Sequence, residues 1–95
     1  MYVYILKCAD KSYYTGVTND MERRLKEHQS GQSISSYTAS RLPVDLVFAE
    51  RVQNPTQAIA FEKQIKGWSR RKKEALIKGD FDLLVEFSKR GSSRG

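Results

Sequence analysis

Two short tyrosine-rich segments near the N-terminus constrain the fold of this chain more than any other feature. Residues 2–8 (YVYILKC) and 13–18 (YYTGVT) are rich in aromatic and β-branched side chains, and residues 9–12 (ADKS) between them are typical of a turn. This pattern predicts a β-hairpin. Gly16, inside the second strand, indicates a bulge or the close approach of another backbone. Alternation along the first strand puts Tyr2, Tyr4 and Leu6 on one face, and Val3 and Ile5 on the other.

A capped helix is expected after the hairpin. Asn19 suits the N-cap, Glu22 stands three residues later as its reciprocal capping partner, and Gly31 follows the last helical positions. With about 100° of rotation per residue, one arc of this helix faces the core. That arc holds Met21, Arg24, Leu25 and His28. A guanidinium and an imidazole are therefore expected beside apolar side chains.

The middle of the chain predicts a loop and then a third strand. Residues 31–43 are rich in Gly, Ser and Thr, a composition typical of a polar loop. Residues 44–52 (VDLVFAERV) predict a strand. Its alternation places Leu46 and Phe48 on one face, and Val47 and Ala49 on the other.

Helices are expected in the C-terminal half. Asn54 followed by Pro55 marks the start of one helix, and Gly67 marks its end. Residues 70–77 predict a short helix, and residues 81–87 have helical spacing, with a strand as the alternative. The apolar arc of the first of these helices holds Ala58, Ile59, Phe61 and Ile65, with Glu62 inside it.

Length, cysteine content and hydropathy narrow the class of protein. Because no repeat or linker divides the 95 residues, residues 1–88 are expected to form one domain and residues 89–95 a flexible basic tail. The single cysteine, Cys8, excludes an intramolecular disulfide and a cysteine-rich zinc cluster. No basic-then-apolar leader and no apolar stretch of about 18 residues are present. We therefore expect a soluble cytoplasmic protein that does not engage a membrane.

The net charge favours an anionic partner. Seventeen basic against eleven acidic residues give a net charge of +6, which suits nucleic acid, a membrane surface or an acidic protein. Residues 63–73 contain six cations and no acid, an arrangement that suits salt-sensitive contacts with phosphates; simple solubility is the alternative. The candidate nucleic-acid contacts are Lys63, Lys66, Arg70, Arg71, Lys72 and Lys73, together with Arg41.

Glu62 is the most specific single candidate for chemistry. A carboxylate among apolar helix neighbours is costly unless a positive charge compensates it. It could bind a divalent cation such as Mg²⁺, which often takes one or two carboxylates together with phosphate oxygens and water. The alternative is a half-exposed ion pair with Lys66, four residues later on the helix. The helical pattern alone favours the ion pair.

Arg24, His28 and the tyrosines each have a functional and a structural interpretation. Arg24 could grip a phosphate through its planar guanidinium, and His28 could carry a proton. Without other clues the favoured interpretation is an arginine stacked on a tyrosine and a hydrogen-bonded core histidine. Tyr4 and Tyr14 are ordinary strand aromatics unless nearby cations stabilise a phenolate, since a free phenol titrates near about 10.

Taken in order, four segments resemble the GIY-YIG endonuclease superfamily, in particular its small stand-alone bacterial members. Tyr2-Val3-Tyr4 is similar to the first signature and Tyr14-Thr15-Gly16 to the second. RRLKEH at 23–28 resembles the arginine helix, and AFEKQIK at 60–66 the segment with the metal-binding glutamate. Each triplet is weak, but the ordered set spans residues 2–78. The first triplet begins with tyrosine instead of glycine, and the second has threonine in its middle. Both departures leave the signature tyrosines, Tyr4 and Tyr14, in place.

The resemblance implies a fold and an activity. The fold is α+β, with a small three-stranded antiparallel sheet flanked by helices. The activity is hydrolysis of phosphodiester bonds in DNA by a metal-dependent endonuclease that uses one Mg²⁺ or Mn²⁺, in DNA repair or processing. The extra DNA-binding domain of many relatives has no counterpart in this sequence. Target choice is therefore expected to come from this domain or from a partner protein.

The resemblance also implies roles for five residues. Tyr4 and Tyr14 would flank the attacking water, Arg24 would bind the scissile phosphate, and Glu62 would hold the metal. His28 matches a supporting histidine. The main rival from another class is a non-catalytic module that binds DNA or RNA through residues 63–73, and a weaker rival is an interaction protein that binds an acidic partner with the same cations.

Overall fold

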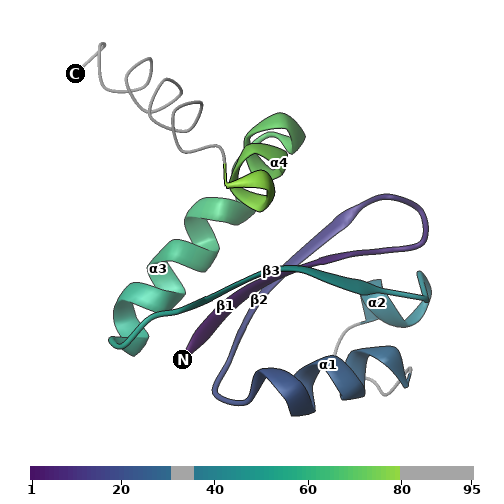
Figure 1. Cartoon of the computed structure of the whole chain (residues 1–95), viewed down its shortest axis with the longest axis horizontal. Helices are drawn as coiled ribbons and strands as arrows, with labels where there is room; N and C mark the ends of the chain where they lie inside the picture. Colours follow the sequence, from purple (N-terminus) through teal and green to yellow (C-terminus); the bar gives the residue numbers. More distant parts are fainter. Residues whose placement is uncertain (31–35, 80–95) are drawn as a thin grey trace.

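The computed structural model describes residues 1–30 and 36–79. Its sheet has three antiparallel strands in the order β2-β1-β3, so β1 is central and β2 is an edge strand. Figure 1 shows α1 and α2 on one side of this sheet and α3 and α4 on the other. The strands are β1 (Tyr2–Lys7), β2 (Tyr13–Thr18) and β3 (Asp45–Arg51), and the helices are α1 (Met21–Gln29), α2 (Ser36–Ala39), α3 (Pro55–Lys66) and α4 (Arg70–Lys78).

This architecture confirms the predicted α+β fold with a three-stranded antiparallel sheet. The element expected over residues 81–87 and the tail at 89–95 lie outside the described residues, as does the end of the domain expected to close at residue 88. In the described part of the chain, no helix is both long and apolar enough to cross a bilayer.

The alternation predicted for β1 separates two hydrophobic clusters. On the side of α3 and α4, Val3 and Ile5 pack with Ala58, Ile65 and Leu76. On the side of α1, the buried cluster consists of Tyr4, Leu6, Cys8 and Val44, flanked by Tyr14, Met21 and Leu25. Cys8 is thus a small core hydrophobe, as its apolar neighbours suggested.

The predicted close approach at Gly16 is present, but the group that approaches is the Tyr4 side chain and not another backbone. Gly16 lies opposite Tyr4 in the register of β1 and β2. A Cβ atom at position 16 would stand 2.6 Å from the Tyr4 hydroxyl oxygen and 2.7 Å from Cζ of the same ring. The missing side chain therefore leaves room for the Tyr4 ring to lie across β2 toward the edge of the sheet.

The start of α1 and the loop after it differ from expectation. The N-cap is Asp20, whose carboxylate accepts the Arg23 backbone N–H at 3.1 Å, so the expectation of Asn19 is wrong by one residue. Glu22 is not part of a capping box in the structure; it forms an ion pair with Lys26 at 3.5 Å. Residues 31–43, predicted as loop throughout, include the short helix α2.

A bulge in β3 breaks the alternation predicted for that strand. Ile5 pairs with Phe48 and Leu6 pairs with Leu46, so Val47 is an extra residue on β3. Val47 and Phe48 consequently both pack against the cluster on the side of α3. The expectation that Leu46 and Phe48 share one face is therefore wrong.

The helix α3 begins and ends as predicted, but its buried stripe is narrower. The Asn54 side chain accepts the backbone N–H groups of Thr56 and Gln57, and Gly67 is the C-cap. Ile59, expected in the apolar arc, is 41% exposed. The buried positions are Ala58, Glu62 and Ile65, so the carboxylate occupies a place that an apolar side chain would normally fill.

Candidate active site

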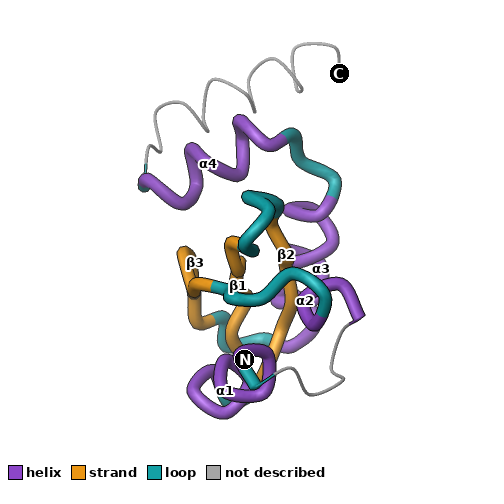
Figure 2. The backbone as a smooth tube through the Cα atoms, turned by 90° about the vertical axis from the view of Figure 1, so that its right-hand side faces the viewer, coloured by secondary structure: helices purple, strands orange, loops and turns teal. Residues whose placement is uncertain are grey.

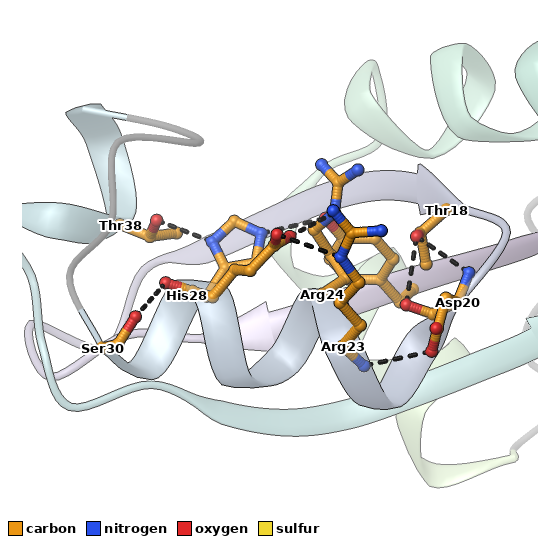
Figure 3. Close-up of polar contacts among 9 residues, drawn as sticks. Thr18, Asp20, Arg23, Arg24, His28, Ser30 and Thr38 are labelled. Carbon is orange, nitrogen blue, oxygen red and sulfur yellow. Dashed lines mark hydrogen bonds and ion pairs between the residues drawn. The ribbon is translucent and has the colours of Figure 1, made fainter.

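A hydrogen-bonded tyrosine–histidine pair forms the centre of the candidate site. The Tyr4 hydroxyl and Nε2 of His28 are 3.0 Å apart, and both residues are only 1% exposed. Nδ1 of His28 makes a second hydrogen bond with the Thr38 hydroxyl at 2.8 Å (Figure 3). Strand alternation turns Tyr4 toward α1, and the core-facing arc of α1 carries His28. The structure thus brings residues 24 positions apart into one buried pair.

Tyr14 completes an aromatic cluster around this pair. The Tyr14 ring centroid lies 5.3 Å from that of His28 and 6.3 Å from that of Tyr4. On its other side, Tyr14 lies 6.2 Å from Tyr37 of α2. Both tyrosines predicted for the site therefore contact the same histidine, and the phenol hydrogen-bonded to it is Tyr4.

Burial and neighbouring charges keep this pair neutral. Burial, the Tyr14 phenol and the carboxylates of Glu62 and Glu27 raise the pKa of Tyr4 well above its usual value of 10, against a lowering effect of Arg24. Burial and the Arg24 guanidinium lower the pKa of His28 below 6.5, against Glu27. At neutral pH the phenol is thus protonated and the imidazole is uncharged.

Arg24 lies one helical turn before His28 on α1 (Figure 3). Its Nε atom is 3.4 Å from a carboxylate oxygen of Glu27, and its side chain is 34% exposed. It lines a cavity of about 200 Å³ with residues of the β2–α1 connection. The guanidinium is therefore oriented by Glu27, acts electrostatically on both Tyr4 and His28, and remains open to an anion from solvent.

Glu62 reaches the site from the other side of the sheet. It lies on α3, is 8% exposed, and forms an ion pair with Lys66 one turn later. Among the described residues it makes no hydrogen bond with Tyr4, Tyr14 or Arg24, but its charge is one of those that act on the Tyr4 hydroxyl. The ion pair predicted as the alternative is thus present, although its carboxylate is buried and not half exposed.

A groove at the edge of the sheet connects the two sides. Since β2 is an edge strand and α3 contacts it (Figure 2), side chains from both faces meet there. Tyr14 and Tyr37 belong to the cluster on the side of α1, whereas Tyr13 belongs to the cluster on the side of α3. The groove has a volume of about 300 Å³ and is lined by Tyr13, Tyr14, Thr15, Tyr37, Lys66 and Lys73.

The donor set at Glu62 fits a magnesium-type ion. In residues 1–30 and 36–79 no three His, Cys, Asp or Glu side chains gather as a metal cluster, so a multi-ligand transition-metal site is not indicated there. Mg²⁺ binds hard oxygen donors and commonly uses one or two carboxylates, with water and phosphate oxygens completing its coordination. The buried Glu62 carboxylate, which is ion-paired with the groove-lining Lys66, is an oxygen donor of the kind that such an ion takes.

The cations of residues 63–73 differ in their surroundings. Lys66 and Lys73 line the groove. Lys63 and Arg71 are exposed. Lys72 lies over the Trp68 ring, with its Nζ atom 4.4 Å from the ring centroid.

Arg70 and Arg41 hold parts of the fold together. The Arg70 guanidinium donates to the Lys11 carbonyl at 2.6 Å, lies over the Tyr13 ring and pairs with Glu74, so it ties α4 to the hairpin. Arg41 lies outside the 63–73 segment, at the end of the sheet, where it pairs with Asp10 and stacks on Tyr37, 3.9 Å from the ring centroid.

Two residues of the site were missed from the sequence. Thr38 binds the second nitrogen of His28, and no periodic pattern marks it because it follows α1 on a separate element. Glu27 orients Arg24 and acts on both Tyr4 and His28; its spacing of three residues from Arg24 on a predicted helix was a usable signal.

Comparisons with known proteins identify the family of this chain. A family model described as the GIY-YIG catalytic domain matches residues 1–75. A UPF0213 protein of Natronomonas pharaonis is 47% identical over 76 residues, which are 80% of this chain and 88% of the relative. A UPF0213 protein of Syntrophus aciditrophicus is 51% identical over 77 residues, 81% of this chain and 88% of the relative.

Two solved structures are also similar. The NMR structure of the UPF0213 protein BH0048 from Bacillus halodurans has a TM-score of 0.54 at 45% identity and covers 81% of each chain. The NMR structure of EF2693 from E. faecalis has a TM-score of 0.58 at 36% identity, covering 86% of this chain and 85% of the other. On the family match and these identities, the chain belongs to the GIY-YIG catalytic domain family, a nuclease superfamily.

Proposed function

We propose that this protein is a divalent-metal-dependent endonuclease that hydrolyses phosphodiester bonds in DNA, in repair or processing. The observation that carries the proposal is the environment of one hydroxyl group. The Tyr4 hydroxyl is hydrogen-bonded to a neutral, buried His28, and the opposite charges of Arg24 and Glu62 both act on it. A phenol with a proton acceptor on one side and anion- and cation-binding groups nearby suits activation of water next to a phosphate.

Because the pKa of Tyr4 is raised, a proton relay through its hydroxyl is favoured over a mechanism that begins with a Tyr4 phenolate. In the tautomer with its proton on Nδ1, His28 donates to Thr38 and its Nε2 accepts the Tyr4 hydroxyl proton. As the water oxygen bonds to phosphorus, the water gives a proton to the Tyr4 oxygen and Tyr4 passes its own proton to His28. The bond to the leaving oxygen breaks, and that oxygen takes a proton from solvent. No phenolate accumulates in this sequence.

Arg24 and Glu62 would supply the charges that this reaction needs. The half-buried guanidinium of Arg24 would bind the phosphate and offset negative charge that gathers on it during attack. Glu62 would hold the Mg²⁺ or Mn²⁺, which when bound supplies Lewis-acid polarisation of a phosphate oxygen. Cations of residues 63–73, above all the groove-lining Lys66 and Lys73, would bind flanking phosphates.

The test compares wild type with Glu62→Gln on a panel of linear, flap and junction DNAs, with and without Mg²⁺ or Mn²⁺. We expect metal-dependent cleavage by wild type, and loss of cleavage by at least about a hundredfold in the variant, since one preorganised charge is commonly worth that much. Folding and DNA binding of the variant should persist. Undiminished cutting by Glu62→Gln would refute the assignment, and DNA binding without cleavage by wild type would favour the non-catalytic binding module.

A further inference from the structure

The Glu62 carboxylate has a cation beside it before any metal arrives. Its side chain is 11% exposed, and the ammonium group of Lys66 is its ion-pair partner. Leaving a buried carboxylate without a compensating charge is strongly destabilising. Glu62 therefore needs a cation at all times, and a bound Mg²⁺ or Mn²⁺ would compete with Lys66 for the same oxygens.

The Lys66 ammonium group has a second polar environment within reach, the groove at the edge of β2. The Lys66 side chain is 55% exposed, and it already lines this groove. The lysine side chain is flexible, with a compact charged head that can exchange partners at little cost in geometry. A move away from Glu62 would thus leave the ammonium in the groove and not in bulk solvent alone.

The groove has the chemistry of a phosphate site. Lys73 adds a second ammonium group, and the buried Thr15 hydroxyl has no hydrogen-bond partner among the described residues. Two ammonium groups and an unpaired hydroxyl suit an anion with several acceptor oxygens. The aromatic rings of Tyr13 and Tyr14 line the same groove and would flank the sugar or base of that nucleotide.

We propose that Lys66 is an exchangeable cation of this site. It neutralises Glu62 while no metal is bound, and it moves into the groove to contact a substrate phosphate when a divalent ion takes its place. This proposal rests on the proposed function, because it assumes that Glu62 is the metal ligand. It predicts that metal and nucleic acid bind with positive coupling, since each makes the displacement of Lys66 less costly for the other.

Metal binding itself, without cleavage, tests the exchange. Mn²⁺ broadens NMR signals of nearby nuclei, so titrating it into the protein and following the α3 amide signals reports binding at Glu62. Lys66→Gln should bind Mn²⁺ on the order of fivefold more tightly than wild type, the size of competition from a partly exposed ion pair. Lys78→Gln is the control, since it removes the same charge from an exposed position on α4, at a residue that is not among the proposed nucleic-acid contacts. It should stay within about twofold of wild type.

The coupling is tested with a phosphorothioate DNA duplex, which resists hydrolysis. Adding this duplex should raise Mn²⁺ affinity on the order of fivefold more in wild type and Lys78→Gln than in Lys66→Gln. Equal Mn²⁺ affinities for wild type and Lys66→Gln would overturn the exchange, even if Glu62→Gln has lost cleavage and the proposed function stands. If neither protein shows broadening around Glu62, the exchange and the metal role of Glu62 both fall.

Discussion

Replacing Gly16 with alanine tests the packing that carries Tyr4 to the edge of the sheet. The new Cβ atom would lie 2.6 Å from the Tyr4 hydroxyl oxygen, 2.7 Å from Cζ and 3.1 Å from Cε1. Because ordinary contacts begin at 3.4 Å, the Tyr4 ring must retreat by about 0.8 Å, the difference between 3.4 and 2.6 Å. The ring is 1% exposed, so the retreat pushes it into packed neighbours and disturbs the 3.0 Å hydrogen bond between its hydroxyl and Nε2 of His28.

The expected cost follows from two opposing terms. Overpacking a core position costs roughly 1–3 kcal/mol. Alanine also loses less backbone entropy on folding than a strand glycine does, which stabilises the variant by roughly 0.5–1 kcal/mol. The net loss in the free energy of unfolding is on the order of 1–2 kcal/mol, which lowers the melting temperature by roughly 5–15 °C for a domain of this size.

Urea unfolding followed by circular dichroism measures the effect, and the chain offers a matched control. Gly67 has φ −83°, and its added Cβ would meet only the Gln64 and Lys63 carbonyls at 3.6 and 4.0 Å, so Gly67→Ala should be neutral or stabilising by up to about 1 kcal/mol. In a Tyr4→Leu background, Gly16→Ala should cost at least about 1 kcal/mol less. Equal costs in the two backgrounds would show that the Tyr4 ring is not what excludes a side chain at position 16.

Two further outcomes concern buried polar groups. Burial lowers the pKa of His28 in the folded protein below 6.5, so the unfolded chain binds more protons from about pH 6.5 down to the folded-state pKa. The free energy of unfolding should therefore be highest above pH 6.5 and decrease as the pH falls through this window. His28→Gln should remove this pH dependence. If urea titrations give the variant the same dependence on pH as wild type, the explanation is contradicted. Thr15→Val removes a buried hydroxyl that has no hydrogen-bond partner among residues 1–30 and 36–79, and should raise the free energy of unfolding by roughly 1 kcal/mol. A loss would indicate that the hydroxyl is hydrogen-bonded.

Local sequence patterns predicted the parts of the fold that local physics decides. The faces of β1 follow from strict alternation, and Tyr4 and Val3 lie on opposite faces as predicted. Asn54 followed by Pro55 could be read as a helix start because a cap and a fixed φ act within one turn. His28 beside apolar residues followed from helical periodicity alone.

Features that depend on distant partners were not predictable in this way. The bulge at Val47 arises from pairing with β1, some forty residues earlier, and Ile59 is exposed because α3 meets the sheet along a narrow stripe. The Tyr4–His28–Thr38 chain joins three separate elements. Sequence alone also left Glu62 with two alternatives, metal ligand or partner of Lys66, and the structure contains the ion pair with Lys66.

The edge position of β2 has a consequence for how a polymer could enter. Within residues 1–30 and 36–79, the groove at this border is lined by side chains from the edge strand β2 and from α2, α3 and α4. A long molecule can be laid into such a border sideways, at any point along its length. Nothing in the arrangement of these described residues calls for threading from a terminus, so we expect circular molecules to be accepted as readily as linear ones.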